Sequence, residues 1–164
     1  MKIKKKINIY LTKTELSITN YFFLKYVFKK LEKNKSFNLV IISTDYKGKK
    51  YFRENSSFFK NIKWINSNEI YSWNDLNLEC PDIFFQAGWT IKPFKHFGKI
   101  SRIENKRCKI ILTADNCFKK NNFRQFIGKY IFRLFYKNLF DYVWVPGESG
   151  KKLMIKFGMN KKKI

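Results

Sequence analysis

The sequence contains few of the residues from which metal and redox sites are built. Its 164 residues include one histidine, three cysteines, three prolines and seven glycines. The cysteines are Cys80, Cys108 and Cys117, and the histidine is His96. No two cysteines form a Cys-x-x-Cys pair and His96 lies far from all of them, which argues against a zinc site. Sparse, odd-numbered cysteines indicate reduced thiols in a cytoplasm, and Cys108, at the start of an apolar run, is expected to be a small buried residue.

The glycine-rich motifs that bind nucleotides are missing as well. A P-loop reads GxxxxGK[ST], and the nearest candidate is "VPGESGKKL", which contains Gly150 and Lys151. The position of its first glycine is Val145, and the position of its hydroxyl residue is Lys152, which argues against nucleotide hydrolysis. The dinucleotide fingerprint GxGxxG should follow the first strand, where the chain reads "TKTELS". We therefore expect no NAD or FAD cofactor.

Long apolar runs are also absent. The N-terminus "MKIKKKINIYLTKTEL" starts with basic residues, but Lys13 and Glu15 soon interrupt its apolar run and no small-residue cleavage site follows. No stretch approaches the roughly 18 apolar residues of a membrane span. The sequence thus predicts a cytoplasmic protein, either soluble or peripheral on the inner face of the membrane.

Positive charge is abundant. The net charge is +23, and aromatic residues, mostly phenylalanine, make up 19% of the chain. Such a charge favours two partners, nucleic acid and an anionic membrane surface. A lysine-rich composition imposed by an AT-rich genome explains the charge equally well, and both explanations stay open. Nucleic acid is the weaker of the two partners, because no nucleic-acid-binding motif is present and lysine far exceeds arginine.

Short apolar runs alternate with helical patterns along the whole chain. This alternation predicts an α/β fold, a Rossmann-like parallel sheet flanked by helices, in one domain over residues 1–164. The predicted strands are 6–11, 37–43, 62–66, 81–88, 108–114 and 141–145. The predicted helices are 17–34, 91–107, 121–140 and 148–158, the last with Gly158 as its C-cap, and 66–77 is expected to be a short helix or turn.

Candidate site residues follow two of these strands, because open α/β sheets bind ligands at the carboxyl ends of their strands. After 81–86, Gly88 lets the backbone approach a ligand, and Trp89 offers a flat stacking face or, alternatively, packs in the core. After 108–113, Asp115 and Asn116 offer a base and a hydrogen-bonding group, or are ordinary turn and capping residues.

The last strand and the long helix carry two further candidates. In "PGESG", Gly147 allows a tight turn at the edge of a cleft, and Glu148 either contacts a ligand or favours the helix dipole. On 121–140, cations recur every four residues beside an apolar stripe, which fits either a helix lying on anionic lipid or a core helix with a solvated edge. The cations are Lys129, Arg133 and Lys137, and the stripe is Phe123, Phe126, Ile127, Tyr130, Ile131, Leu134 and Phe135.

The second half of the chain resembles a known enzyme family. The runs "PDIFFQAGW", "CKIILTADN" and "FDYVWVPGESGKKLMIKFGMNKKKI", with the amphipathic helix between the last two, resemble the N-terminal domain of the family 4 glycosyltransferases. That domain is the first Rossmann-like half of the two-domain GT-B fold. Four features of the family have counterparts here. Its strand starting Pro-Asp falls on Pro81-Asp82, and its Thr-x-His-Asp turn falls on Thr113 to Asn116. Its strand starting with Asp falls on Asp141, and its Gly-x-x-x-x-Lys-Ile helix end falls on 158–164.

The resemblance implies transfer of a sugar from a nucleotide-sugar to an acceptor, a cell-envelope glycan or a lipid-linked sugar. Gly88, Trp89 and Asn116 would line the acceptor side, and any base role passes to Asp115 because the family's histidine is absent. The family's glycine-rich first turn is replaced by "TKTELS". No metal is expected, since no Asp-x-Asp pair occurs.

The resemblance also implies an incomplete enzyme. The family holds its nucleotide-sugar chiefly with a second domain, and we expect that donor-binding domain to be absent here, so that the chain alone is inactive and a second chain is a possible partner. Two other functions stay open: a basic α/β module that binds nucleic acid, and a non-catalytic subunit of a split transferase.

Overall fold

Six parallel strands form one sheet in the part of the chain that the structure describes. The structure is a computed structural model, and the described residues are 6–14, 18–32, 36–44, 62–120 and 122–164. The strands are β1 (Ile7–Lys13), β2 (Phe37–Thr44), β3 (Ile62–Ile65), β4 (Ile83–Ala87), β5 (Lys109–Thr113) and β6 (Tyr142–Trp144). They lie side by side in the order β3-β2-β1-β4-β5-β6, and every neighbouring pair is parallel.

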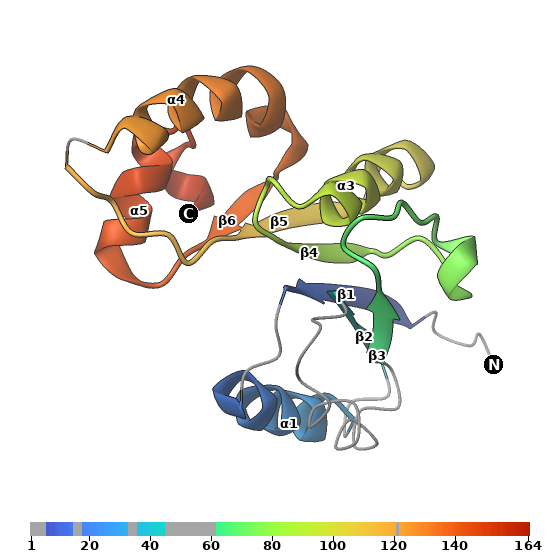
Figure 1. The fold of residues 1–164 in the computed structure, drawn as a ribbon. Coiled ribbons are helices and arrows are strands. Elements are labelled where there is room, and N and C mark those ends of the chain that lie inside the picture. Colours follow the sequence, from blue (N-terminus) through green and yellow to red (C-terminus); the bar gives the residue numbers. More distant parts are fainter. Residues whose placement is uncertain (1–5, 15–17, 33–35, 45–61, 121) are drawn as a thin grey trace.

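Helices cover both faces of this sheet, as Figure 1 shows. Helix α1 (Ile18–Glu32) lies on one face, and α3 (Lys92–Glu104), α4 (Phe123–Ile131) and α5 (Gly147–Lys156) lie on the other. The predicted Rossmann-like α/β fold is therefore confirmed. Short 3-10 turns at Asn74–Leu76, Lys137–Leu139 and Lys161–Lys163 and a π-helical turn at Phe132–Tyr136 complete the described elements.

Strand β2 shows how the apolar runs build two cores. Its side chains alternate between the faces of the sheet, as in any strand. Val40 and Ile42 pack in the large cluster under α3 and α5, whereas Leu39 and Ile41 pack with Leu24 of α1. Both faces are buried, which explains why this strand is a continuous apolar run rather than an alternating one.

The predicted elements differ from the observed ones mainly at their ends. Strand β1 extends to Lys13, two residues beyond its prediction, whereas the short helix or turn expected within 66–77 is present as the 3-10 turn Asn74–Leu76. The predicted helix 121–140 ends as an α-helix at Ile131, continues as a π-helical turn over Phe132–Tyr136 and closes with a 3-10 turn. Gly158 has φ +94° just after α5, as expected of a C-cap glycine.

The three cysteines differ in exposure, and this predicts their reactivity. Burial is the main cause that raises the pKa of the Cys108 thiol to about 12 and that of the Cys80 thiol to about 11. Cys117 is exposed. Because the thiolate is the nucleophile, we expect iodoacetamide at mildly alkaline pH to alkylate Cys117 first, with Cys80 and Cys108 reacting only after denaturation. Peptide mass spectrometry measures the three rates, and fast labelling of Cys108 in the folded chain would contradict this burial.

Candidate functional site

A cavity of about 570 Å³ opens at the carboxyl ends of β1, β4, β5 and β6. The sheet order reverses between β1 and β4, so the cavity lies at the point of an open α/β sheet where ligands commonly bind. Each of the four strands contributes residues at its end or shortly after it. Among them are Lys13 at the end of β1 and Thr14 after it, Gly88 and Ile91 after β4, Asp115 after β5, and Trp144 at the end of β6 with Pro146 after it.

Buried polar side chains shape the turn after β4. Thr12 Oγ1 accepts a hydrogen bond from the Ala87 amide (2.6 Å) and donates one to the Phe85 carbonyl (3.0 Å), joining β1 to β4 at the reversal point. Gly88 donates its amide to the Thr113 carbonyl (2.9 Å) and has φ +65°, which a side chain would strain. The backbone at Gly88 is therefore fixed beside the cavity, and it carries no side chain there.

Lys13 and Asp115 bring opposite charges to the cavity. They come from β1 and from the loop after β5, which β4 separates in the sheet. Burial lowers the pKa of the Lys13 amine, and the negative charge of Asp115 opposes that shift. Lys13 was not among the predicted site residues, because the apolar pattern that predicts its strand ends at Leu11. The lining of the cavity thus contains both a half-buried cation and an exposed carboxylate.

Replacing Asp115 with asparagine is expected to lower the pKa of Lys13 further, because the amine stays desolvated and loses the charge that favours its protonated form. An NMR titration of the Lys13 side chain measures this. The matched control is Glu148→Gln, which removes an exposed carboxylate paired with Lys151 and should leave the Lys13 pKa unchanged. An unchanged Lys13 pKa in Asp115→Asn would show that the two groups do not interact.

Trp89, a predicted stacking residue, packs against helices instead of lining the cavity. Its ring contacts Phe132, Tyr136 and Phe157, with ring centroids 5.7, 5.3 and 6.3 Å away. Among the described residues, the aromatic side chain that lines the cavity is Trp144, which is 54% exposed. The structure therefore favours the packing interpretation of Trp89 and provides a different aromatic surface at the site.

The other three predicted site residues lie outside the lining of this cavity. Asn116 is exposed and directly follows Asp115. Gly147 has φ +70°, which fits its predicted role in the turn into α5. Glu148 is exposed and pairs with Lys151 at 3.4 Å on the first turn of α5. The structure thus brings Gly88 and Asp115 together, whereas these three remain predictions of ligand contact.

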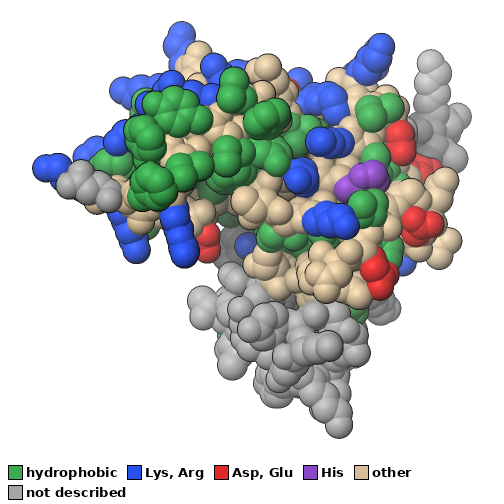
Figure 2. All heavy atoms as spheres, turned by 45° about the horizontal axis from the view of Figure 1, so that its top comes forward, with side chains coloured by type: hydrophobic (Ala, Val, Ile, Leu, Met, Phe, Trp, Pro, Cys, Tyr) green, Lys and Arg blue, Asp and Glu red, His purple; other side chains and the backbone are tan. Residues whose placement is uncertain are grey.

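The apolar stripe of the long helix is exposed. All seven of its side chains are exposed, with Phe123 at 74% and Leu134 at 75%, so the core-helix interpretation is wrong. Figure 2 shows hydrophobic side chains gathered over α4 with lysine and arginine around them. We call this surface the α4 stripe, and it consists of Phe123, Phe126, Ile127, Tyr130, Ile131, Leu134 and Phe135.

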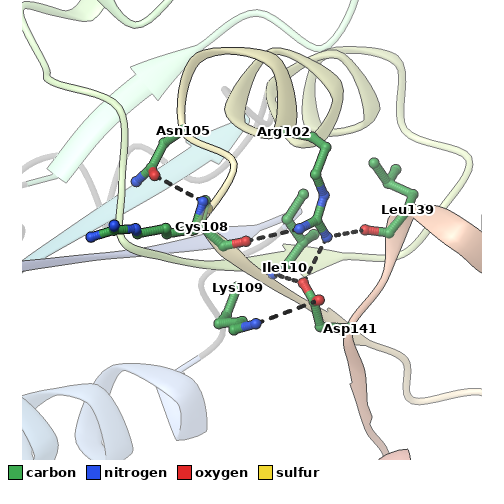
Figure 3. A network of polar contacts seen from close by, with 8 residues as sticks. Arg102, Asn105, Cys108, Lys109, Ile110, Leu139 and Asp141 are labelled. Atoms are coloured by element: carbon green, nitrogen blue, oxygen red, sulfur yellow. Dashed lines mark hydrogen bonds and ion pairs between the residues drawn. The ribbon is translucent and has the colours of Figure 1, made fainter.

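Two aspartates of the family resemblance, Asp82 and Asp141, lie directly before β4 and β6 at the amino-end edge of the sheet. Asp82 Oδ2 accepts the Asn8 amide (2.9 Å), and Asp141 Oδ2 accepts the Ile110 amide (2.9 Å). Asp141 also accepts a hydrogen bond from Arg102 Nη2 (2.6 Å), and Arg102 donates in addition to the carbonyls of Cys108 and Leu139 (Figure 3). Each carboxylate pins the start of its strand to the neighbouring strand, so both residues are structural.

The described residues contain no group of three or more His, Cys, Asp or Glu side chains arranged to hold a metal ion. No described helix is long and apolar enough to cross a membrane.

Comparisons with known proteins support the fold. No protein-family model matches the chain, and no curated protein matches it. Among solved structures, the chain is similar to a protein from Listeria monocytogenes that is named for a proposed UDP-N-acetylglucosamine 2-epimerase activity. The TM-score is 0.59 at 13% sequence identity, over 97% of this chain and 43% of that protein. The chain therefore spans less than half the length of this neighbour, and the likeness shows a GT-B-like Rossmann fold.

Proposed function

We propose that the chain is the acceptor-binding half of an enzyme that uses a nucleotide-sugar, a glycosyltransferase of the family 4 type. The observation that carries this proposal is the cavity at the reversal point of the sheet, with Lys13, Gly88 and Asp115 around its opening. The fold of a neighbour named for UDP-sugar chemistry supports it, as does the resemblance of residues 81–164 to the transferase family.

The lining supplies what binding a sugar acceptor requires. Trp144 offers an apolar ring face to the C–H face of a pyranose, and Gly88 lets the sugar approach the backbone. Asp115 accepts the proton of the attacking hydroxyl as a general base. Lys13 attracts a phosphate on the acceptor, as in a lipid-linked or phosphorylated sugar. A second Rossmann-like half, on the other side of the cleft, would bind the donor nucleotide.

A second candidate follows from the neighbour's name. An epimerase that inverts carbon 2 of a UDP-sugar needs no acceptor, and its carboxylate would act on a carbon-bound proton rather than on a hydroxyl. We rank this candidate second, because the motif resemblance favours the transferase. Epimerisation and transfer give different products from the same UDP-sugar, which separates them experimentally.

The experiment has a binding part and a reaction part. In NMR spectra of the chain, N-acetylglucosamine is expected to shift the amides of Gly88, Ala114 and Asp115, while UDP leaves them in place. Shifts of these amides by UDP alone would assign the cavity to the donor and overturn the acceptor role. A His96→Gln variant, altered outside the lining, should give the same shifts as wild type.

The reaction part first searches the DNA beside the gene for a second Rossmann-like half, and then uses the chain joined to it or mixed with it. We expect UDP release from a UDP-sugar only when an acceptor is present, and a fall of about 100-fold in Asp115→Asn with acceptor binding retained. Conversion of UDP-N-acetylglucosamine without any acceptor would replace the transferase with the epimerase. Full activity of Asp115→Asn would remove Asp115 from the mechanism.

A further inference from the structure

The fold does not require the α4 stripe. The opposite side of the helix holds it to the molecule: Phe132 is fully buried, and Gly128 lies so close to Phe157 and Trp89 that an added Cβ would contact both at 3.5 and 3.7 Å. Soluble proteins rarely expose contiguous apolar surface of this kind without an interaction that uses it. The stripe therefore needs an occupant.

The surroundings of the stripe are basic. Residues 116–140 contain six lysine or arginine side chains and no aspartate or glutamate. Arg133 is committed to the fold, since its Nη2 donates to the Lys156 carbonyl at 3.0 Å. Lys129 places its Nζ 5.2 Å from the ring centroid of Tyr130, so that a cation lies directly beside the apolar surface. The occupant thus has both an apolar and an anionic part.

A groove of about 420 Å³ adjoins the stripe between α4, α5 and the loop before α4. Three lysines line it, Lys119, Lys129 and Lys156, and Lys156 Nζ lies 4.7 Å from the ring centroid of Phe118. Phenylalanine rings from the stripe form its other wall, including Phe126. Three ammonium groups around an aromatic groove suit a phosphate that is attached to an apolar tail.

We propose that the α4 stripe docks on the surface of an anionic lipid bilayer, with its apolar side chains in the interface and a lipid phosphate in the groove of Lys119, Lys129 and Lys156. A helix that is apolar on one face and basic along its flank lies in the plane of a membrane interface. Each basic residue near an anionic leaflet adds to the attraction.

Other occupants fit less well. A second copy of the chain would bring together two molecules of net charge +23, which repel each other. Duplex nucleic acid would satisfy the cations but leave the seven exposed apolar side chains without contact, and a single strand would use only the aromatic ones for stacking. The bilayer surface satisfies both features at once.

The groove and the cavity share one loop. Asp115 lines the cavity, and Phe118 lines the groove three residues later, where its amide donates to Ser149 Oγ at 3.1 Å. A docked chain would therefore hold the mouth of the cavity close to the lipid headgroups. Docking itself does not depend on the proposed enzymatic function, and its test uses no substrate.

The test is flotation of the purified chain with vesicles of phosphatidylcholine alone or mixed with phosphatidylglycerol. We expect binding to the phosphatidylglycerol vesicles and little to phosphatidylcholine alone. High salt should weaken this binding without abolishing it, because the apolar contact is insensitive to screening. The double variant Phe126→Ser/Leu134→Ser should bind about ten-fold more weakly or worse, whereas Ile103→Ser, which alters a 76% exposed side chain on α3, should bind as wild type.

A matched pair of charge variants separates the groove from overall charge. Lys119→Glu/Lys129→Glu and Lys92→Glu/Lys99→Glu change the net charge equally, and only the first pair lies at the groove. We expect the groove pair to lose about ten-fold more affinity for phosphatidylglycerol vesicles than the α3 pair. Circular dichroism of each variant confirms that it is folded.

Three results would overturn the proposal. Equal losses in both charge pairs, with no effect of the serine variants, would show attraction by total charge alone. A dimer in sedimentation experiments that the serine variants convert to a monomer would make the stripe an interface between copies. Tight binding to DNA that requires the groove lysines, together with no vesicle binding, would assign the surface to nucleic acid.

Discussion

Replacing Trp73 with alanine is expected to lower the free energy of unfolding by about 4 kcal/mol and the melting temperature by about 10 °C. Trp73 is 2% exposed and joins three elements through ring contacts. Its ring stacks on Phe97 of α3 at 4.4 Å and lies 5.3 Å from Tyr10 of β1 and 5.6 Å from Phe84 of β4. Alanine would leave a large cavity at this junction, and thermal and urea unfolding measure the loss.

Two variants calibrate this loss. Among the described residues, the Trp73 Nε1–H has no hydrogen-bond acceptor, so Trp73→Phe removes volume together with an unsatisfied donor and should cost only about 1 kcal/mol. Trp144→Ala, at an exposed position, should cost less still. An unfolding free energy of Trp73→Ala within about 1 kcal/mol of wild type would mean that the connection between β3 and β4 repacks without Trp73.

Replacing Asp141 with alanine is the second large effect, a loss of about 2 to 3 kcal/mol in the free energy of unfolding. The carboxylate accepts the Ile110 amide and the Arg102 guanidinium, and Lys109 Nζ lies 4.0 Å away. Alanine leaves the Ile110 amide of β5 and the charged Arg102 side chain of α3 without this acceptor. Asp141→Asn keeps one acceptor oxygen and should lose less, and Glu148→Ala, which breaks an exposed pair, should be close to neutral.

Asp141 also gives the stability a defined pH dependence. Burial raises the pKa of the carboxyl, but the hydrogen bonds from Ile110 and Arg102 and the charges of Arg102 and Lys109 outweigh burial and lower it. Because the folded pKa lies below the unfolded value of about 3.9, the stabilisation is present above that value and is lost as the pH falls through the folded pKa. The difference between wild type and Asp141→Asn should therefore shrink below about pH 4, and a difference that persists there would contradict this account.

The strands were predictable because buried parallel strands are short apolar runs, and the prediction of 37–43 matches β2 at Phe37–Thr44. The end of the long α-helix at Ile131 was not predictable. The π-helical turn over Phe132–Tyr136 follows it directly, and the apolar spacing continues across both. Periodicity also shows which side chains share a face, but not whether another element packs on it. For that reason the sequence left the α4 stripe open between core and surface.

The site was predictable only in part. Gly88 and Asp115 line the cavity, and they were predicted as candidates because residues directly after buried strands lie at the edge where open α/β sheets bind ligands. Lys13 and Trp144 were missed because they are the last residues of their strands. In the sequence, a lysine there only marks the end of an apolar run, and a tryptophan there looks the same as a buried core residue. Trp89 and Trp144 both lie near the end of a predicted strand, so the sequence does not tell which one is buried. The structure does, because Trp89 packs against Phe132. The extent of the domain, 1–164, stays a prediction.

Asp82 and Asp141 connect β4 and β6 to their neighbouring strands, and this role concerns the architecture of the sheet. Both carboxylates serve the amino-end edge of the sheet, opposite the cavity, and each holds a neighbouring backbone amide at 2.9 Å. These hydrogen bonds stabilise the sheet and impose nothing on the reaction at the other edge. Any chain with aspartates at both positions is therefore expected to share this sheet, whatever reaction its opposite edge supports.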